Sequence, residues 1–158
     1  LRILAYNRVV TDLGGRSTAQ VIAELQEHFS LEPTGSAEPP DRNSFCVYAD
    51  GTWYRFGVEP TGSGTIERLD VSLLQDQILE PFFGIADPRT DPRIDFVGGS
   101  RGTDELERRA DASGGIAFSL HPTSLEELFA VADAGEIMPP KSTWFEPKLR
   151  SGLFVHRI

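Results

Sequence analysis

The stretch that decides the fold is Ser44-Phe45-Cys46-Val47-Tyr48-Ala49-Asp50-Gly51-Thr52-Trp53-Tyr54-Arg55-Phe56-Gly57-Val58. Two runs rich in β-branched and aromatic residues are separated in it by the dipeptide Asp50-Gly51. This dipeptide supplies the positive φ angles of a tight type I′ turn, so the stretch predicts an antiparallel β-hairpin. A hairpin in the middle of the chain disfavours a purely parallel, doubly wound sheet.

Elements on both sides of the hairpin are predicted from apolar spacing. The run Arg2 to Val10 predicts a strand, and Ser17 to Phe29 predicts an amphipathic helix that begins at Ser17. The proline-rich stretch Pro33 to Arg42 predicts an exposed loop. Further strands are expected at 94–97, 115–120 and 152–156, and further helices at 70–80, 103–112 and 124–132.

Residues at the helix ends support these boundaries. We expect Asp70 or Ser72, Thr103, and Thr123 or Ser124 to cap the three later helices, and Pro81 to end the first of them. Leu125, Leu128, Phe129 and Ala132 share the predicted apolar face of the last helix. Together these elements predict an α+β fold with a mixed, partly antiparallel sheet and helices packed on its faces.

Length and composition are typical of a single folded domain over residues 1–158. Hydrophobic residues make up 39% of the chain and charged residues 25%, which excludes wholesale disorder. The chain opens on Leu1 rather than Met and runs directly into a predicted strand. We therefore expect it to be a fragment of a longer protein or a processed chain.

Charge, hydropathy and cysteine content exclude several classes of function. The net charge of −9 disfavours non-specific nucleic-acid binding by this piece. No apolar stretch approaches the roughly 18 residues that span a bilayer, so no membrane partner is expected. Cys46 is the only cysteine, which excludes an intrachain disulfide and a cysteine-based zinc site. These features favour a reducing cytoplasm.

The segment Gly135 to Thr143 comes within one residue of the phosphate-binding loop G-x-x-x-x-G-K-[ST]. Pro140 stands in place of the second glycine, and prolines lack the backbone N–H groups that cradle phosphate, so we reject the standard loop. Individual donors nevertheless indicate an anion or substrate site, namely Lys141, Ser142, Thr143 and Lys148. The alternative is a proline-stiffened loop that docks Trp144 and Phe145 into the core.

Three weaker patterns have ordinary structural explanations. The run Gly98 to Gly102 follows a strand and precedes a helix, where open amides can meet a phosphate, but glycines in a turn explain it equally. His121, at a strand end, is either a base or a packing residue. The carboxylates Asp87, Asp91 and Asp95 indicate salt bridges to Arg89 and Arg93, with a magnesium loop as the alternative; no local metal motif is present.

Three segments together resemble the C-terminal portion of a large prokaryotic family, domain-of-unknown-function family 1015. The first is Ile3-Leu4-Ala5-Tyr6-Asn7-Arg8-Val9-Val10, and the second comprises Asp70-Val71-Ser72, Leu79-Glu80-Pro81 and Gly84-Ile85. The third and most specific is Met138-Pro139-Pro140-Lys141-Ser142-Thr143-Trp144-Phe145-Glu146-Pro147-Lys148-Leu149. The N-terminal part of that family resembles the ParB and sulfiredoxin superfamily, which includes DNA-segregation proteins, nucleotide-dependent phosphotransfer enzymes and a free-serine kinase. Its D-G-H-x-R-type motif is missing from this sequence.

The resemblance implies roles for particular residues. Asp70 and Lys141 would be catalytic, with Asp70 orienting groups or binding metal, and Arg8 would clamp a carboxylate or phosphate. Lys148, Ser142 and Thr143 would bind the anion alongside them. Many family members carry histidine where Asn7 stands, and asparagine cannot shuttle a proton near neutral pH, so Asn7 is expected only to bind.

Two hypotheses of function follow. In the first, the intact protein transfers or removes a phosphoryl group on a small, perhaps serine-like metabolite with ATP or ADP and Mg²⁺, and this fragment is inactive without its own N-terminal part. In the second, the chain is a non-catalytic module that binds a small-molecule ligand or regulates a partner. A structural extension of a ParB-like domain is the remaining alternative.

Overall fold

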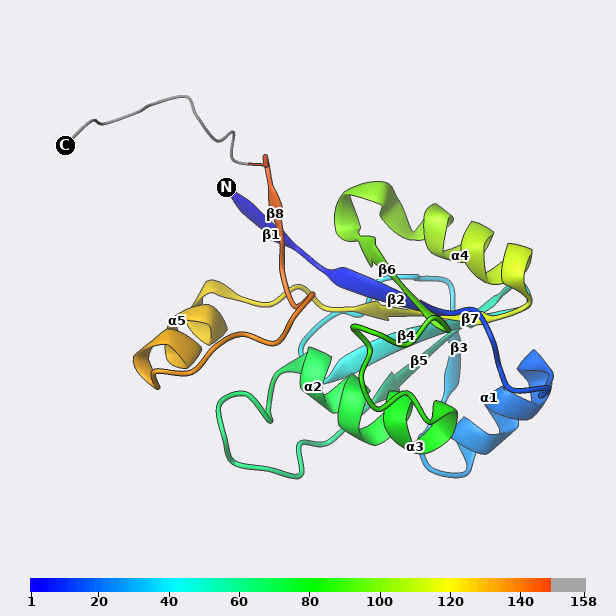
Figure 1. Ribbon diagram of the computed structural model, residues 1–158. Helices are drawn as coiled ribbons and strands as arrows, with labels where there is room; N and C mark the ends of the chain where they lie inside the picture. The colour runs from blue at the N-terminus through cyan, green and yellow to red at the C-terminus, as the bar shows by residue number, and fades with distance from the viewer. Residues whose placement is uncertain (149–158) are drawn as a thin grey trace.

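The computed structural model describes residues 1–148 of the chain. Its main feature is a six-stranded sheet in the order β3-β5-β4-β7-β2-β6, and each neighbouring pair is antiparallel. The strands are β2 (Tyr6–Val10), β3 (Glu32–Thr34), β4 (Ser44–Ala49), β5 (Thr52–Gly57), β6 (Ile94–Gly98) and β7 (Ile116–Leu120). The predicted α+β class is confirmed (Figure 1), and the sheet, expected to be mixed and partly antiparallel, is antiparallel at every pair among the described residues.

The predicted hairpin forms the centre of one half of this sheet. Strands β4 and β5 pair in register from Ser44 opposite Gly57 to Ala49 opposite Thr52. The two turn residues have positive φ angles, 46° at Asp50 and 82° at Gly51, as a type I′ turn requires. Local sequence alone therefore fixes this register.

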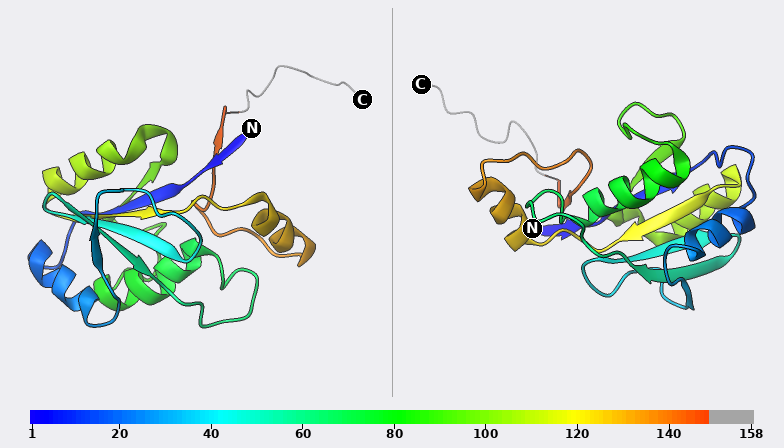
Figure 2. Two further views of the ribbon diagram at one scale, coloured as in Figure 1. Left: turned by 180° about the vertical axis from the view of Figure 1, so that it is seen from behind. Right: turned by 90° about the horizontal axis from the view of Figure 1, so that it is seen from below.

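Helices cover both faces of the sheet (Figures 1 and 2). Helix α4 (Gly102–Ser113) packs on one face against β2, β4 and β7. The other face is covered by α1 (Thr18–Gln26) and by the continuous helical segment α2 (Asp70–Leu74), a π-helical turn (Gln75–Leu79) and α3 (Glu80–Phe83). Alternate strand residues supply the two cores, as the two-residue period of a β-strand requires.

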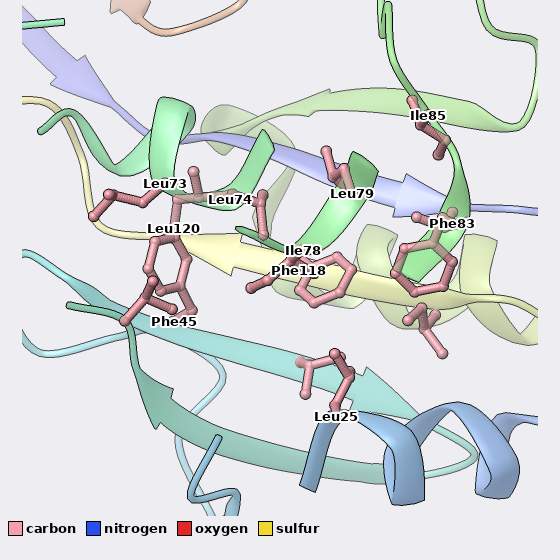
Figure 3. Packing of buried hydrophobic residues seen from close by; sticks show 14 of the residues in the cluster. Leu25, Phe45, Leu73, Leu74, Ile78, Leu79, Phe83, Ile85, Phe118 and Leu120 are labelled. Atoms are coloured by element: carbon pink, nitrogen blue, oxygen red, sulfur yellow. The ribbon is translucent and has the colours of Figure 1, made fainter. Parts of the chain in front are cut away.

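The larger core lies on the α1 and α2 face (Figure 3). Phe45 and Phe118 are fully buried side chains of neighbouring strands β4 and β7, and Leu25 of α1 and Ile78 of the π-helical turn pack against them. Burying each such side chain contributes roughly 1.5–3 kcal/mol. This core anchors the helical segment 70–83, which forms one wall of a pocket described below.

The predicted end of a helix at Pro81 is wrong. The helix continues through Pro81 to Phe83 and ends at Gly84, which has a left-handed φ of 65°. In a regular α-helix a proline lacks the N–H of the backbone hydrogen bond and clashes with the carbonyl four residues earlier. Here a π-helical turn lies just before Pro81 and widens the backbone hydrogen-bond spacing, because the Glu80 N–H donates to the Gln75 carbonyl, five residues earlier. A π-helical turn thus accommodates the proline without ending the helix.

Of the four helix starts predicted from the sequence, two are confirmed and two are wrong. Ser17 and Ser124 each form a capping box, at α1 and at α5 (Leu125–Asp133). In contrast, α2 begins after Leu69, with Asp70 in its first turn, and α4 begins after Arg101. The side chains of Leu69 and Arg101 do not cap these helices. Thr103 lies inside the first turn of α4 and is not its cap.

Two further predictions need correction. Within the expected loop 33–42, Pro33 and Thr34 belong to the edge strand β3, which tolerates a proline that donates no hydrogen bond. In α5 the buried residues are Glu127 and Val131, whereas Leu125 and Phe129 of the predicted apolar face are 51% and 59% exposed. Helix α5 stands beside the sheet and not over it (Figures 1 and 2).

A small second sheet joins the two ends of the described chain. Strand β1 (Arg2–Leu4) pairs with β8 (Trp144–Glu146) in antiparallel register. This pairing lays the proline-rich C-terminal segment beside β2 (Figure 1). The strand expected at 152–156 lies outside the described residues, and within residues 1–148 no helix is long and apolar enough to cross a membrane.

Candidate functional site

Strand β2 carries two consecutive buried polar residues, Asn7 and Arg8. Each is only 4% exposed. Because side chains alternate along a strand, they point to opposite faces of the sheet. Each lines a different pocket, Arg8 on the α2 face and Asn7 on the α4 face.

Arg8 is a buried cation without a carboxylate partner among residues 1–148. One guanidinium nitrogen donates to the Lys141 carbonyl at 3.0 Å and the other donates to the Tyr6 carbonyl. The guanidinium carbon lies 5.0 Å from the centre of the Phe96 ring. Burial lowers the pKa of Arg8 to about 10, so the group stays charged near neutral pH at a cost in solvation.

A pocket of about 220 Å³, which we call the Arg8 pocket, lies against this guanidinium. The helical segment contributes Ser72, Gln75 and Asp76, and the loop after it contributes Arg89. The remaining wall includes Pro139 and Pro140 of the C-terminal segment. The Gln75 amide nitrogen donates to the Ile85 carbonyl at 2.7 Å, while its buried oxygen has no partner among the described residues.

The C-terminal segment places its two lysines on aromatic rings. The ammonium of Lys141 lies 5.4 Å from the Tyr6 ring centre and 3.5 Å from the Tyr6 hydroxyl. The ammonium of Lys148 lies 3.6 Å from the Trp144 ring centre. Cations attract the negative faces of aromatic rings, so these contacts hold both lysine side chains in place. Lys141 is itself strained, with a left-handed φ of 59°.

The two hydroxyl residues beside Lys141 differ in exposure. Ser142 is only 5% exposed, and its carbonyl accepts a bond of 3.3 Å from the Thr123 hydroxyl. Thr143 is half-buried. Neither side-chain hydroxyl is bonded to another described residue, so both remain available as donors.

Asp70 belongs to a different cluster of charges. It is 8% exposed, and its Oδ1 accepts a bond of 2.9 Å from the Asn43 N–H. Burial raises the pKa of Asp70 to about 6, with Glu127 raising it further and Arg42 and His121 lowering it. Asp70 does not line the Arg8 pocket.

The structure therefore brings together part of the predicted set. Arg8 and Lys141 are in direct contact, and the loop that carries Lys141 closes the Arg8 pocket. Asn7 lies on the opposite face of the sheet, and Lys148 contacts Trp144 near the chain end. Their roles remain predictions.

Sequence analysis missed Ser72 as a pocket residue, and also Gln75, Asp76 and Arg89. Ser72, Gln75 and Asp76 follow one another on the helical segment 70–83. The π-helical turn Gln75–Leu79, which comes before Pro81, is the feature that could have pointed to them. Arg89 gave no such signal, because its spacing from Asp87 already explains it as an ion pair.

The acidic and glycine-rich loops have structural explanations. Asp87 pairs with Arg89 at 3.0 Å and Asp91 pairs with Arg93 at 2.6 Å, which confirms the predicted salt bridges. Within residues 1–148, no group of three His, Cys, Asp or Glu side chains is arranged to hold a metal ion. A Cβ on Gly98 would lie 2.2 Å from the Trp144 ring, so this glycine is needed for packing.

Comparisons with known proteins address the family. The sequence model of the family described as "Protein of unknown function (DUF1015)" matches residues 1–72. This match confirms the predicted family resemblance over that part of the chain. Among curated proteins, no sequence matches this chain.

Two of the solved structures that resemble the chain are free serine kinases. One, in complex with AMP, is 16% identical with a TM-score of 0.49; a mutant in complex with ADP is 18% identical with a TM-score of 0.46. Each similarity covers 90% of this chain and 53% of that chain. The chain thus spans about half the length of these structures, and we base no functional inference on them.

Proposed function

We propose that the protein whose residues 1–72 match the DUF1015 family binds a small anionic metabolite of amino-acid size at the Arg8 pocket. The observation that carries this proposal is the buried guanidinium of Arg8, for which residues 1–148 supply two carbonyls and no carboxylate. A buried charge is costly unless it is paired. A carboxylate or phosphate of a ligand would supply the missing charge, and arginine matches both in geometry.

The remaining groups of the pocket suit a ligand that also carries hydrogen-bond donors. Asp76 presents a carboxylate at the exposed rim. An ammonium or hydroxyl group on the ligand would donate to it. A zwitterionic hydroxy-amino acid or its phosphorylated form, such as serine or phosphoserine, combines these features.

The volume of the pocket limits the size of this ligand. At about 220 Å³ it is smaller than the pockets of roughly 300–1,000 Å³ that hold drug-sized molecules. A nucleotide would exceed it, whereas an amino acid would not. The π-helical turn that supplies Gln75 and Asp76 is also a feature that often marks functional sites.

We further propose that the intact protein transfers or removes a phosphoryl group on this metabolite, with ATP or ADP and Mg²⁺ as the cofactors. Lys141 supports this step, because its ammonium is held beside Tyr6 and makes no ion pair with another described residue. Its backbone carbonyl is bonded to Arg8, so the lysine and the anion site move as one unit. Lys148, Ser142 and Thr143 would add donors for the transferred group.

A binding module without catalysis is the second candidate. One observation favours it: Asp70, the carboxylate predicted to orient the reacting groups, is bonded to the Asn43 N–H and lies outside the Arg8 pocket. Metal and nucleotide would then have to be held by other parts of the intact protein. The two candidates share the Arg8 site and differ in turnover.

Calorimetric titration of the intact protein with serine and phosphoserine tests the binding site. Arg8→Lys keeps a positive charge but loses the forked donor geometry, and it should weaken binding by about tenfold or more. Arg108→Lys is the matched control, because Arg108 is exposed, is paired with Glu105 and does not line the Arg8 pocket. Equal affinities for wild type and Arg8→Lys would refute the site.

A phosphotransfer assay then separates the two candidates. ATP or ADP with Mg²⁺ should phosphorylate serine or dephosphorylate phosphoserine in the wild type. Lys141→Ala should abolish turnover while leaving metabolite affinity largely unchanged, because the Lys141 contact with Arg8 uses the backbone carbonyl. Binding without turnover would leave the non-catalytic module as the function.

A further inference from the structure

A second pocket, of about 330 Å³, lies on the opposite face of the sheet. We call it the Asn7 pocket. Strands β2 and β7 form its floor through Asn7 and Ser119, and the start of helix α4 forms one wall through Gly99, Gly102 and Thr103. His121, just beyond the end of β7, closes another side. None of these residues lines the Arg8 pocket.

Two nearly inaccessible polar side chains face this space without using all their donors. Asn7 is 4% exposed and Ser119 is 2% exposed. The Asn7 oxygen accepts a bond of 3.0 Å from the Leu120 N–H, which fixes the amide plane. Neither the Asn7 amide nitrogen nor the Ser119 hydroxyl is bonded to another residue within 1–148.

Among the described residues, the buried side-chain atoms without a partner are Asn43 Oδ1 and Gln75 Oε1. The Asn7 and Ser119 donors are not among them, so these two atoms open onto the pocket and can reach a ligand in it. Both side chains also interrupt an otherwise apolar face, where Val9 and Ala117 are their neighbours along the two strands. A ligand with acceptor atoms would complete them.

The start of helix α4 forms the wall beside these two donors. A turn of 3-10 helix (Gly99–Arg101) leads into the 12-residue helix, and Arg101 at its start makes no side-chain cap. The Gly99 and Gly102 N–H groups already donate to the Ala5 and Gly99 carbonyls, so this wall offers an anion the positive end of the helix dipole and not free N–H groups. Gly102 has a positive φ of 73°, and a Cβ there would meet no atom within 4 Å, so the wall is open at this point.

The two charged side chains of the pocket have opposite signs. Arg2 and Glu38, one basic and one acidic, line it and offset one another. The Nδ1 atom of His121 lies 3.4 Å from the Pro39 carbonyl, so in the tautomer that donates this bond Nε2 is an acceptor. The donors of the interior are therefore the Asn7 and Ser119 side chains.

From these observations we propose that the Asn7 pocket is a second ligand site, separate from the Arg8 pocket, that binds the phosphate group of a small molecule. The Asn7 amide and the Ser119 hydroxyl donate to its oxygens, and the positive end of the α4 helix dipole lies beside them. The site has room for a phosphate with an attached group, so both inorganic phosphate and a nucleoside diphosphate are sources of the same chemistry. It does not depend on the Arg8 proposal, because the two pockets lie on opposite faces of one sheet.

Amide NMR of the protein during titration with inorganic phosphate, and separately with ADP, tests this site. Saturable shifts are expected for the backbone amides of Gly99, Gly102 and Thr103 and for the side-chain amide of Asn7. Ser119→Ala removes one donor, and Asn7→Asp replaces the donor amide by a repelling carboxylate. Each should weaken binding by about tenfold or more, the loss expected for a hydrogen bond to a charged group.

Controls separate this site from the other one and from misfolding. Arg89→Lys, in the Arg8 pocket, should leave the affinity for phosphate at these amides unchanged within about twofold, since the two pockets lie on opposite faces of the sheet and share no residue. Ser119→Ala is the conservative variant, and its unperturbed amide spectrum without ligand shows that it folds. Tighter binding of ADP than of phosphate identifies a nucleotide site, and equal binding identifies a phosphate site. Absence of saturable shifts with both probes, or shifts that survive both substitutions, overturns the proposal.

Discussion

Asp70→Asn should stabilise the protein near neutral pH, although Asp70 is buried and hydrogen-bonded. The Asn43 N–H donates to the Asp70 Oδ1, and asparagine retains a carbonyl oxygen at that place. The substitution therefore keeps the bond and removes the charge. What it eliminates is the cost of holding an ionised carboxylate in a site that is 8% exposed, with Glu127 nearby.

The size of the effect follows from the pKa. Burial raises the pKa of Asp70 to about 6 from the ordinary 3.8, which corresponds to roughly 3 kcal/mol at 1.36 kcal/mol per pKa unit. The folded state holds the proton more tightly than the unfolded state does. Stability from this group is therefore greatest below pH 4, falls as the pH rises from about 4 to 6, and stays low above that.

Urea unfolding between pH 4 and pH 8, followed by tryptophan fluorescence, measures the prediction. The difference between Asp70→Asn and wild type should grow with pH through this window and approach roughly 3 kcal/mol in favour of the variant at pH 8. Asp70→Ala is the matched control, because it also removes the acceptor for the Asn43 N–H and should lose roughly 1–3 kcal/mol of that gain. Arg42 and His121, the cations near Asp70, are unchanged in both.

A difference that stays constant from pH 4 to pH 8, or a variant less stable than wild type throughout, would refute this reasoning. A constant difference would mean that burial does not raise the pKa of Asp70, and a variant less stable than wild type at pH 8 would mean that neighbouring groups favour the carboxylate more than burial disfavours it. The outcome also bears on function. A carboxylate that is kept despite a cost in stability is expected at a site under functional constraint, so a stabilised variant without activity would support the catalytic role predicted for Asp70.

Three other substitutions or reactions test the fold. Gly98→Ala should destabilise the protein by roughly 1–3 kcal/mol in urea unfolding, because its Cβ would overlap the Trp144 ring; an unchanged midpoint would contradict the packing. The Cys46 thiol, whose pKa burial raises to about 11, should react with a disulfide reagent at pH 8 only after unfolding; rapid labelling of the native protein would show an open core. Phe129→Gln should change stability by less than about 0.5 kcal/mol, whereas the buried Val131→Ala should cost at least about 1 kcal/mol; the reverse order would restore the apolar face predicted from the sequence.

The features that sequence predicted well are those determined by neighbouring residues. The turn Asp50-Gly51 adopts the predicted angles because only a few residue types tolerate them. Ser17 and Ser124 cap their helices because each bonds a backbone N–H three residues on. In each case the stabilising interaction joins residues at most three positions apart, so it can be predicted without knowing the fold.

Features that sequence could not predict depend on distant contacts. The spacing of Leu125 and Phe129 indicates an amphipathic helix, but it does not say whether the sheet lies under that face, and here it does not. The Arg8 pocket is built from segments that are separated by dozens of residues and meet only through the sheet and the β1–β8 pairing. Lys141 and Arg8 were both selected as binding residues, yet nothing in the sequence alone indicated that they touch.

A single property of β2 connects both proposed sites. Its successive residues point to opposite faces of a sheet that is covered by helices on both sides, so a polar pair in this strand must place one polar group in each core. Asn7 and Arg8 are such a pair, and within residues 1–148 each keeps donors that no neighbour uses. The two proposals therefore assign one ligand to each face, and a protein carrying both Asn7→Leu and Arg8→Leu should bind neither. Asn7→Leu also leaves the buried Leu120 N–H without its acceptor, so urea unfolding should show a loss of roughly 1–3 kcal/mol alongside the loss of binding.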